Sequence, residues 1–167
     1  MTADVIKILQ ENFSGEILSV EDNFGKTSVI VRKNSLHSIL EFLKKDARAS
    51  FEMLIDICGI DYLHLNKSAP QTPRYEIVYQ LYSLSLNHRL CVRAQVTAED
   101  MLLRTATDLW PAANWSEREA AEMFGFVFEG HPNPKNLLLY QDFPGHPLRK
   151  DYAMDKRHAI PVPLEKL

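Results

Sequence analysis

Two neighbouring stretches in which apolar and polar residues alternate, 75–84 and 89–96, constrain the fold of this 167-residue chain most strongly. Alternation with a period of two is typical of β-strands that bury one face. The short connection around Asn87-His88 predicts that the two strands pair in antiparallel fashion. In the second stretch, the apolar positions are Leu90, Val92, Ala94 and Val96, and they alternate with Arg89, Cys91, Arg93 and Gln95.

The first 45 residues predict the element order α-β-β-α. Apolar residues at helical spacing indicate a helix that Thr2 caps and Gly15 ends. β-rich residues 17–20 and 27–31 flank a turn at residues 22–25, which favours a hairpin. A second helix is expected after a Ser35 cap, with four apolar residues on one face: Leu36, Ile39, Leu40 and Leu43.

The middle of the chain gives weaker patterns. Residues 51–62 predict a short helix that runs into a strand, and residues 98–110 predict a helix that Pro111 interrupts. A last helix is expected to begin at Ser116, because Ser116 and Glu119 have the spacing of a capping box, and to end at Gly125. Together these elements predict an α+β fold with a mixed, largely antiparallel sheet and helices packed on it.

Six of the nine prolines lie in residues 131–167. Proline removes a backbone donor and fixes φ, so this density predicts an irregular C-terminal arm after a folded body of residues 1–130. The arm is mildly basic whereas the body is acidic, and it is too apolar for a solvated tail. We expect the arm to dock on a partner; the alternative is that it wraps back on its own body.

Composition excludes several function classes. Hydrophobic residues make up 46% of the chain, enough for a core, and the net charge of -3 argues against a nucleic-acid partner. No apolar stretch reaches the roughly 20 residues needed to span a bilayer, and the N-terminus lacks a secretory signal, so we expect a cytoplasmic location. Cys58 and Cys91 cannot supply the four thiolates of a typical iron–sulfur cluster, and no nucleotide-binding glycine loop is visible.

The charged residues after Trp115 allow catalytic and structural interpretations. Glu117 and Glu119 lie two positions apart and would point to different sides of a helix, so we expect them to cap and form salt bridges instead of sharing a catalytic site. Arg118 and Glu122 are four apart and can pair on the helix surface.

A mononuclear metal site is a second possibility. The residue types are suitable, but the spacing is loose and a proline follows each histidine. We therefore favour turn formation and backbone hydrogen bonding by the four candidate ligands, which are His131, Asp142, His146 and Asp151.

Residues 110–151 carry a family resemblance in two blocks. In the first, an E-R-E triplet is followed by an acid, two apolar residues, a histidine and a basic residue. The second block reads Gly-His-Pro-Leu-Arg-Lys-Asp over residues 145–151. Both resemble the 30 kDa subunit family of the proton-pumping NADH:quinone oxidoreductase (respiratory complex I). The first block comprises Glu117, Arg118, Glu119, Glu122, Met123, Phe124, His131 and Lys135.

This chain departs from the family pattern at a few positions. The family usually has an aromatic residue in place of Ala121, aspartate in place of Glu122, and paired arginines in place of Lys135 and Asn136. Related subunits occur in membrane-bound [NiFe] hydrogenases and formate hydrogenlyases.

The resemblance implies a non-catalytic structural subunit in the soluble arm of complex I, which supports electron transfer from NADH to quinone coupled to proton translocation. It implies no cofactor in this chain, with the flavin and iron–sulfur clusters in partner subunits. The implied partners are the large quinone-site subunit and the cluster-bearing subunits. The implied location is peripheral, on the cytoplasmic side of the inner (plasma) membrane, with membrane association only through the complex.

Two alternatives stay open at this point. One is the equivalent subunit of a membrane-bound [NiFe] hydrogenase or formate hydrogenlyase, and the other is a free-standing metal-dependent hydrolase. Under the leading hypothesis the isolated chain is inactive and has no catalytic residue. The residues expected at partner interfaces are Glu117, Arg118, Glu119, Glu122, His131, Lys135, His146, Arg149, Lys150 and Asp151.

Overall fold

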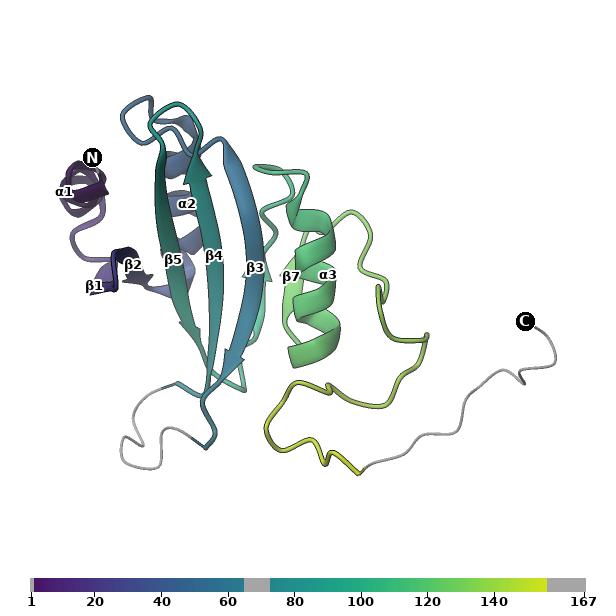
Figure 1. The fold of residues 1–167 in the computed structure, drawn as a ribbon. Helices are drawn as coiled ribbons and strands as arrows, with labels where there is room; N and C mark the ends of the chain where they lie inside the picture. Colours follow the sequence, from purple (N-terminus) through teal and green to yellow (C-terminus); the bar gives the residue numbers. More distant parts are fainter. Residues whose placement is uncertain (1, 65–72, 156–167) are drawn as a thin grey trace.

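The computed structural model describes residues 2–64 and 73–155 of the chain, which form a five-stranded sheet with helices packed on it (Figure 1). The sheet order is β1-β2-β5-β4-β3, and β2 with β5 is its one parallel pairing. The expected mixed, largely antiparallel α+β fold is thereby confirmed. The strands are β1 (Ile17–Asn23), β2 (Lys26–Val31), β3 (Met53–Asp61), β4 (Tyr75–Ser83) and β5 (His88–Val96).

Within the described residues, three α-helices and a second, two-stranded sheet complete the architecture. The 3-10 helix η1 (Lys33–Ser35) leads into the second α-helix, and the two short strands of the second sheet run parallel. No helix in this part of the chain has the length and apolar character needed to cross a membrane. The remaining elements are α1 (Thr2–Phe13), α2 (Leu36–Lys45), α3 (Ala113–Phe124), β6 (Leu102–Arg104) and β7 (Val127–Glu129).

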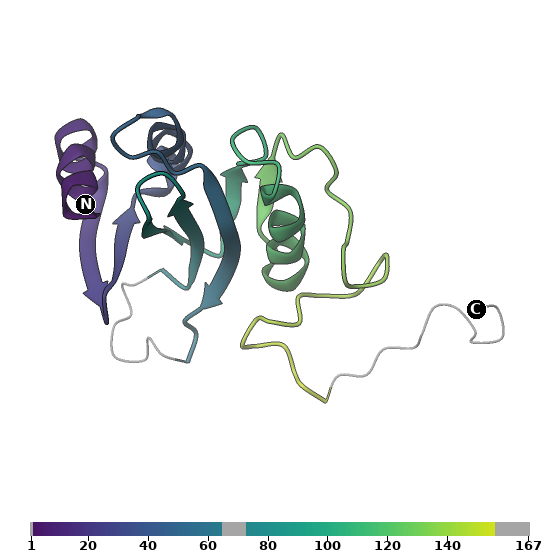
Figure 2. The same cartoon turned by 45° about the horizontal axis from the view of Figure 1, so that its top comes forward.

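The core lies on one face of the large sheet. Figures 1 and 2 show α2 packed against that face, while the opposite face of β3, β4 and β5 carries no helix from the described residues. Every second residue of β4, from Tyr75 to Leu81, is buried on the helix side. The four apolar residues predicted for one face of α2 are all buried there, each contributing about 1.5–3 kcal/mol by removal from water.

The two sequence-predicted strand pairs are confirmed. β4 and β5 pair from Tyr75↔Val96 to Ser83↔His88. β1 and β2 form the expected hairpin, in which Phe24 (φ 56°) and Gly25 (φ 76°) both adopt positive φ at the turn. That backbone matches the right-handed twist of a tight hairpin, and the Asp22 carboxylate accepts a bond from the Gly25 N–H at 3.1 Å.

Two helical predictions are wrong. Residues 51–62 contain the predicted strand but no helix, because β3 occupies Met53–Asp61. A bulge between Leu54 and Asp56 interrupts the alternation of β3. Residues 98–110 form the short strand β6 and a turn instead of a helix. The pairing of β6 with β7, some 25 residues later, is a long-range contact that local pattern does not reveal.

The predictions that Ser35 and Ser116 cap helices through their side chains are also wrong. α3 begins at Ala113, so Ser116 lies inside the helix, and the N-cap residue Ala112 makes no side-chain bond. Ser35 does stand at the N-cap of α2, but its hydroxyl donates to Glu16 instead of capping the helix. Gly125 ends α3 as predicted, with φ of 84°. The side chain of Thr2 lies outside the described residues.

Gly59 allows α3 to approach β3. A Cβ atom there would lie 2.6 Å from Cδ2 of Phe124 and 2.8 Å from Cε2 of Phe126. Figure 1 shows α3 standing beside β3, and Phe126 also contacts the Tyr75 ring edge-on at 6.3 Å between centroids. The absence of a side chain at residue 59 therefore allows Phe124 of α3 and Phe126 to pack closely against β3.

We predict that Gly59→Ala lowers the free energy of unfolding by about 1–3 kcal/mol, because the two phenylalanine rings must move in a packed core. Gly15→Ala is the matched control, since nothing lies within 4 Å of a Cβ at that exposed position. Urea unfolding of both variants and the parent measures the difference. Equal midpoints for Gly59→Ala and Gly15→Ala would contradict this account of the helix approach.

Candidate functional site

The last two turns of α3 bind the first part of the C-terminal arm. We call the contacts between residues 118–125 and residues 135–151 the clasp. At its first contact, the Arg118 guanidinium donates from Nε to the carbonyl of Lys135 at 2.7 Å and from Nη2 to that of Asn136 at 2.8 Å. The fork geometry of a guanidinium suits two neighbouring acceptors.

Glu122 makes the next contact, one helical turn later. Its buried carboxylate accepts three consecutive backbone N–H groups, from Leu137 at 2.9 Å, Leu138 at 2.8 Å and Leu139 at 3.2 Å. Hydrogen bonds to a carboxylate are stronger than neutral ones. Glu122 thus fixes the irregular arm where no strand or helix supplies backbone partners.

The C-terminal end of α3 is capped by residues of the second signature block. The last carbonyls of a helix have no partner within the helix. Here, His146 Nδ1 donates to the carbonyl of Glu122 at 2.9 Å, and the N–H of Leu148 donates to that of Met123 at 3.1 Å. Arg149 Nε then donates to the carbonyl of Phe124 at 2.6 Å, which also places a positive charge at the negative end of the helix dipole.

Gly125 makes room for these capping groups. A Cβ atom at residue 125 would lie 2.2 Å from Nη2 of Arg149 and 2.7 Å from Nε2 of His146. The positive φ of the residue disfavours any L side chain as well. Both the conformation and the space therefore favour glycine at this position.

The end of β3 anchors the arm at a second point. Asp61 is buried, and its carboxylate accepts the N–H of Lys150 at 2.8 Å and two donors of the Arg74 guanidinium at 3.0 and 2.8 Å. Burial alone would raise the pKa of Asp61, but the bonds from Arg74, Lys150 and Leu63 outweigh it and lower the pKa. Arg74 also pairs with Asp151 at 2.9 Å, which closes the arm onto the sheet.

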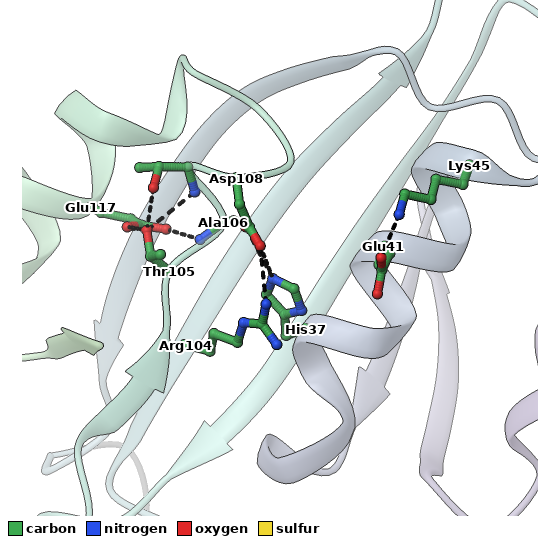
Figure 3. Close-up of polar contacts among 9 residues, drawn as sticks. His37, Glu41, Lys45, Arg104, Thr105, Ala106, Asp108 and Glu117 are labelled. Atoms are coloured by element: carbon green, nitrogen blue, oxygen red, sulfur yellow. Dashed lines mark hydrogen bonds and ion pairs between the residues drawn. The ribbon is translucent and has the colours of Figure 1, made fainter. Parts of the chain in front are cut away.

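Glu117 is the most deeply buried acid of α3, and Figure 3 shows it pointing toward the loop after β6. Its carboxylate accepts the N–H of Ala106 and the hydroxyl of Thr105, both at 2.6 Å. Burial raises the pKa of Glu117 to about 7, although these two bonds oppose the shift. The expectation that Glu117 caps the helix or forms a surface salt bridge is wrong, because the helix begins earlier and turns this residue inward.

The same loop is tied to α2 on its outer side. Figure 3 shows Asp108 facing His37, whose Nε2 lies 3.1 Å from both carboxylate oxygens, while Arg104 Nη2 lies 3.3 Å away. Residues 105–109 are therefore held from inside by Glu117 and from outside by His37.

The structure divides the predicted interface residues into two groups. Arg118 and Glu122 each bind the arm, and the pair that their spacing allows is not formed. His131 and His146 form hydrogen bonds to backbone groups, the role that the sequence analysis favoured over metal binding. His131 Nε2 donates to the Asn114 carbonyl at 3.0 Å, and His131 Nδ1 accepts the Asn133 N–H. The exposed group comprises Glu119, Lys135, Lys150 and Asp151.

No group of three or more His, Cys, Asp or Glu side chains within residues 2–64 and 73–155 is arranged to hold a metal. The structure also brings in Asp61 and Arg74, which the sequence analysis missed. The one local signal was Asp61 itself, an acid near the end of a mainly apolar stretch that also contains Asp56. Its partner Arg74 lies 13 positions later in the sequence, and no spacing rule connects the two.

A model of the family described as respiratory-chain NADH dehydrogenase, 30 Kd subunit, matches residues 29–158. The chain belongs to this family. The matched range begins within β2 and includes β5, β4 and β3 of the large sheet, α3 and the whole clasp.

Curated relatives from several bacteria are the C subunits of NADH-quinone oxidoreductase. The protein from Geotalea uraniireducens is 38% identical over 150 residues, covering 90% of this chain and 86% of that protein. The C subunit from Citrifermentans bemidjiense is 39% identical over 146 residues, covering 87% of this chain and 86% of that protein. The hydrogenase-type alternative is therefore not favoured.

Two solved structures share the fold. A trypsin-resistant fragment of Nqo5 is 36% identical with a TM-score of 0.66, covering 77% of this chain and 98% of that chain. A chain of the archaeal membrane-bound sulfane sulfur reductase is 21% identical with a TM-score of 0.72, covering 92% of this chain and 86% of that chain. The second likeness shows the fold alone.

We predict that Glu122→Ala releases the arm, because three backbone N–H groups lose their shared acceptor. The expected loss is about 1.5–3 kcal/mol of local stability. Hydrogen exchange at residues 137–139 measures it, and Glu119→Ala, at an exposed position three residues earlier, is the control. Unchanged exchange at these three amides in Glu122→Ala would show that Glu122 does not hold the arm.

Proposed function

We propose that this chain is a non-catalytic structural subunit of the soluble arm of NADH:quinone oxidoreductase, supporting electron transfer from NADH to quinone coupled to proton translocation. The observation that carries the proposal is the family match over residues 29–158. The clasp supports it, since the signature residues hold an extended segment on the body instead of surrounding a reactive centre.

The electron-transfer groups are proposed to lie in other subunits. In this proposal the flavin and iron–sulfur clusters belong to partners, and the isolated chain does not oxidise NADH. The chain offers only two cysteines, Cys58 and Cys91, and both are free and half-buried. Burial raises the pKa of both thiols, which disfavours the thiolate that a cluster requires.

The proposed partners are the large quinone-site subunit and the cluster-bearing subunits, reached through the arm. In this proposal, the inward residues of the signature blocks position the arm, and the exposed ones contact the neighbour. Leu138 and Leu148 support it, because 62% and 49% of their surfaces remain exposed although the arm is bound. Exposed apolar side chains on an ordered segment suit an interface.

The division into a body of residues 1–130 and an arm of residues 131–167 remains part of the proposal. The Nqo5 fragment supports it, since a trypsin-resistant piece covers 77% of this chain, close to the share of the body. We also propose that the chain sits on the cytoplasmic side of the inner (plasma) membrane and associates with the membrane only through the complex.

We predict that the double variant Lys135→Glu, Lys150→Glu enters the complex less well while the isolated chain unfolds at an unchanged midpoint. Both side chains are exposed, so reversing their charges leaves the clasp intact but places like charges against an acidic partner surface. Lys26→Glu, at the tip of the distant β1–β2 hairpin, is the control. The measurement is incorporation on co-expression with the other subunits, with mass spectrometry of the native complex to identify the partners.

Normal incorporation of the double variant would argue against a partner at the arm. The proposed complex would be contradicted if mass spectrometry found this chain together with a hydrogenase large subunit and without a quinone-site subunit.

We also predict that a chain ending at His131 folds cooperatively but fails to assemble. All the elements of the core end before Gly130, whereas the clasp and the exposed apolar residues are lost. Unfolding of the truncated chain, measured beside its incorporation, separates the two effects. An unfolded truncated chain would show that the arm serves its own body.

A further inference from the structure

Glu117 has no basic partner matched to its charge. The residue is fully buried, and within the described part of the chain no lysine or arginine forms an ion pair with it. The nearest candidate cation is His131, whose Nε2 lies 3.9 Å from Oε2 of Glu117. His131 Nδ1 accepts the Asn133 N–H, and its Nε2 donates to the Asn114 carbonyl, an arrangement that suits the neutral ring.

A short chain of hydroxyl groups leads away from the Glu117 carboxyl. Its Oε2 lies 2.6 Å from Thr105 Oγ1, which lies 2.9 Å from Thr107 Oγ1. Thr107 is half-buried and lines an open bowl of about 660 Å³ together with Arg104, Asp108 and Asn114. The buried carboxyl is thus connected to a solvent-facing surface through two side chains.

This chain of hydroxyls can satisfy both charge states of Glu117. When the carboxyl is ionised, the Thr105 hydroxyl donates to it. When the carboxyl is protonated, its O–H donates to Thr105, whose own hydroxyl turns to donate to Thr107. A hydroxyl both donates and accepts, so the reversal needs only rotation of O–H bonds. The bond from the Ala106 N–H to the other carboxyl oxygen can persist in both states.

We propose that Glu117 is a buried proton-binding site that exchanges with solvent through the hydroxyls of Thr105 and Thr107. Its charge state is transmitted to the loop of residues 105–109, which it holds through Ala106, and to the start of the arm beside His131.

The titratable groups around Glu117 come from three directions. Asp108 of the loop raises the pKa of Glu117 in addition to burial, and Asp108 is itself bound by His37 of α2 and Arg104 of β6. Tyr79 of β4 is fully buried, and both burial and the Glu117 charge raise its pKa, so it remains neutral. His131 closes the third side. None of these groups offers Glu117 a permanent positive charge.

Proton binding at Glu117 makes the stability of the folded chain depend on pH. Because the folded-state pKa is about 7 against an ordinary value of 4.5, the folded chain binds more protons than the unfolded chain between these values. The stability contributed by the bound proton is complete below pH 4.5 and is lost as the pH rises to about 7.

The test is a nuclear magnetic resonance titration of the full chain with ¹³C-labelled glutamate side chains. We expect one carboxyl with a midpoint near pH 7, absent in Glu117→Gln and unchanged in Glu119→Gln. A glutamate set that titrates entirely below about pH 5.5 would overturn the proposal, because an ordinary glutamate lies well under that value. So would survival of the neutral-range midpoint in Glu117→Gln.

Thr105 variants test the hydroxyl chain and do not depend on whether Glu117→Gln folds. Thr105→Val removes the donor to the ionised carboxylate, so the midpoint should rise by about one pH unit or more. Thr105→Ser keeps the hydroxyl and should restore the parent value. If the valine variant titrates at the parent midpoint, the hydroxyl does not serve the carboxyl and the proposed route is wrong.

Discussion

The arrangement of the second half of the chain depends on how the C-terminal turn of α3 satisfies its carbonyl groups. Three consecutive carbonyls, of Glu122, Met123 and Phe124, receive donors from the arm. Without such donors, the carbonyl groups at the end of the helix would need water as their hydrogen-bond partner. The Arg149 guanidinium stands there instead, with its central carbon 5.4 Å from the centre of the Tyr75 ring. The helix and the arm therefore complete each other's hydrogen bonding, which is why a proline-rich segment follows a defined course along the body (Figure 1).

The acids of α3 perform different tasks because of their positions around the helix axis. Glu117 faces the core and the loop after β6, Glu122 faces the arm, and Glu119 faces solvent. The short signature on α3 thereby joins the helix to the loop after β6 and to the arm. The resemblance to the 30 kDa subunit family identified the protein correctly, while the physical role of each acid required the three-dimensional arrangement.

The sequence predicted those features that arise from local periodicity. The hairpin, α2 and the β4–β5 pair were all recognisable from alternation or helical spacing. The failures occurred where a long-range partner decided the local structure. β3 was obscured by its bulge, and β6 forms only because β7 pairs with it. Ser116 has the spacing of a cap, but the chain enters the helix one turn earlier, after Pro111. Neither the burial of Glu117 nor the Asp61–Arg74 pair could be inferred without tertiary contacts.

Most clasp bonds join side chains of the body to backbone atoms of the arm. Arg118 and Glu122 contact carbonyl and amide groups of residues 135–139. Outside the clasp, Asp61 contacts the amide of Lys150 in the same way. Any non-proline residue presents the same groups, so side chains at these arm positions are free to change without loss of attachment. These arm positions can thus acquire new surface chemistry while the course of the arm stays fixed, whereas His146, Arg149 and the body residues that bind through their side chains have no such freedom.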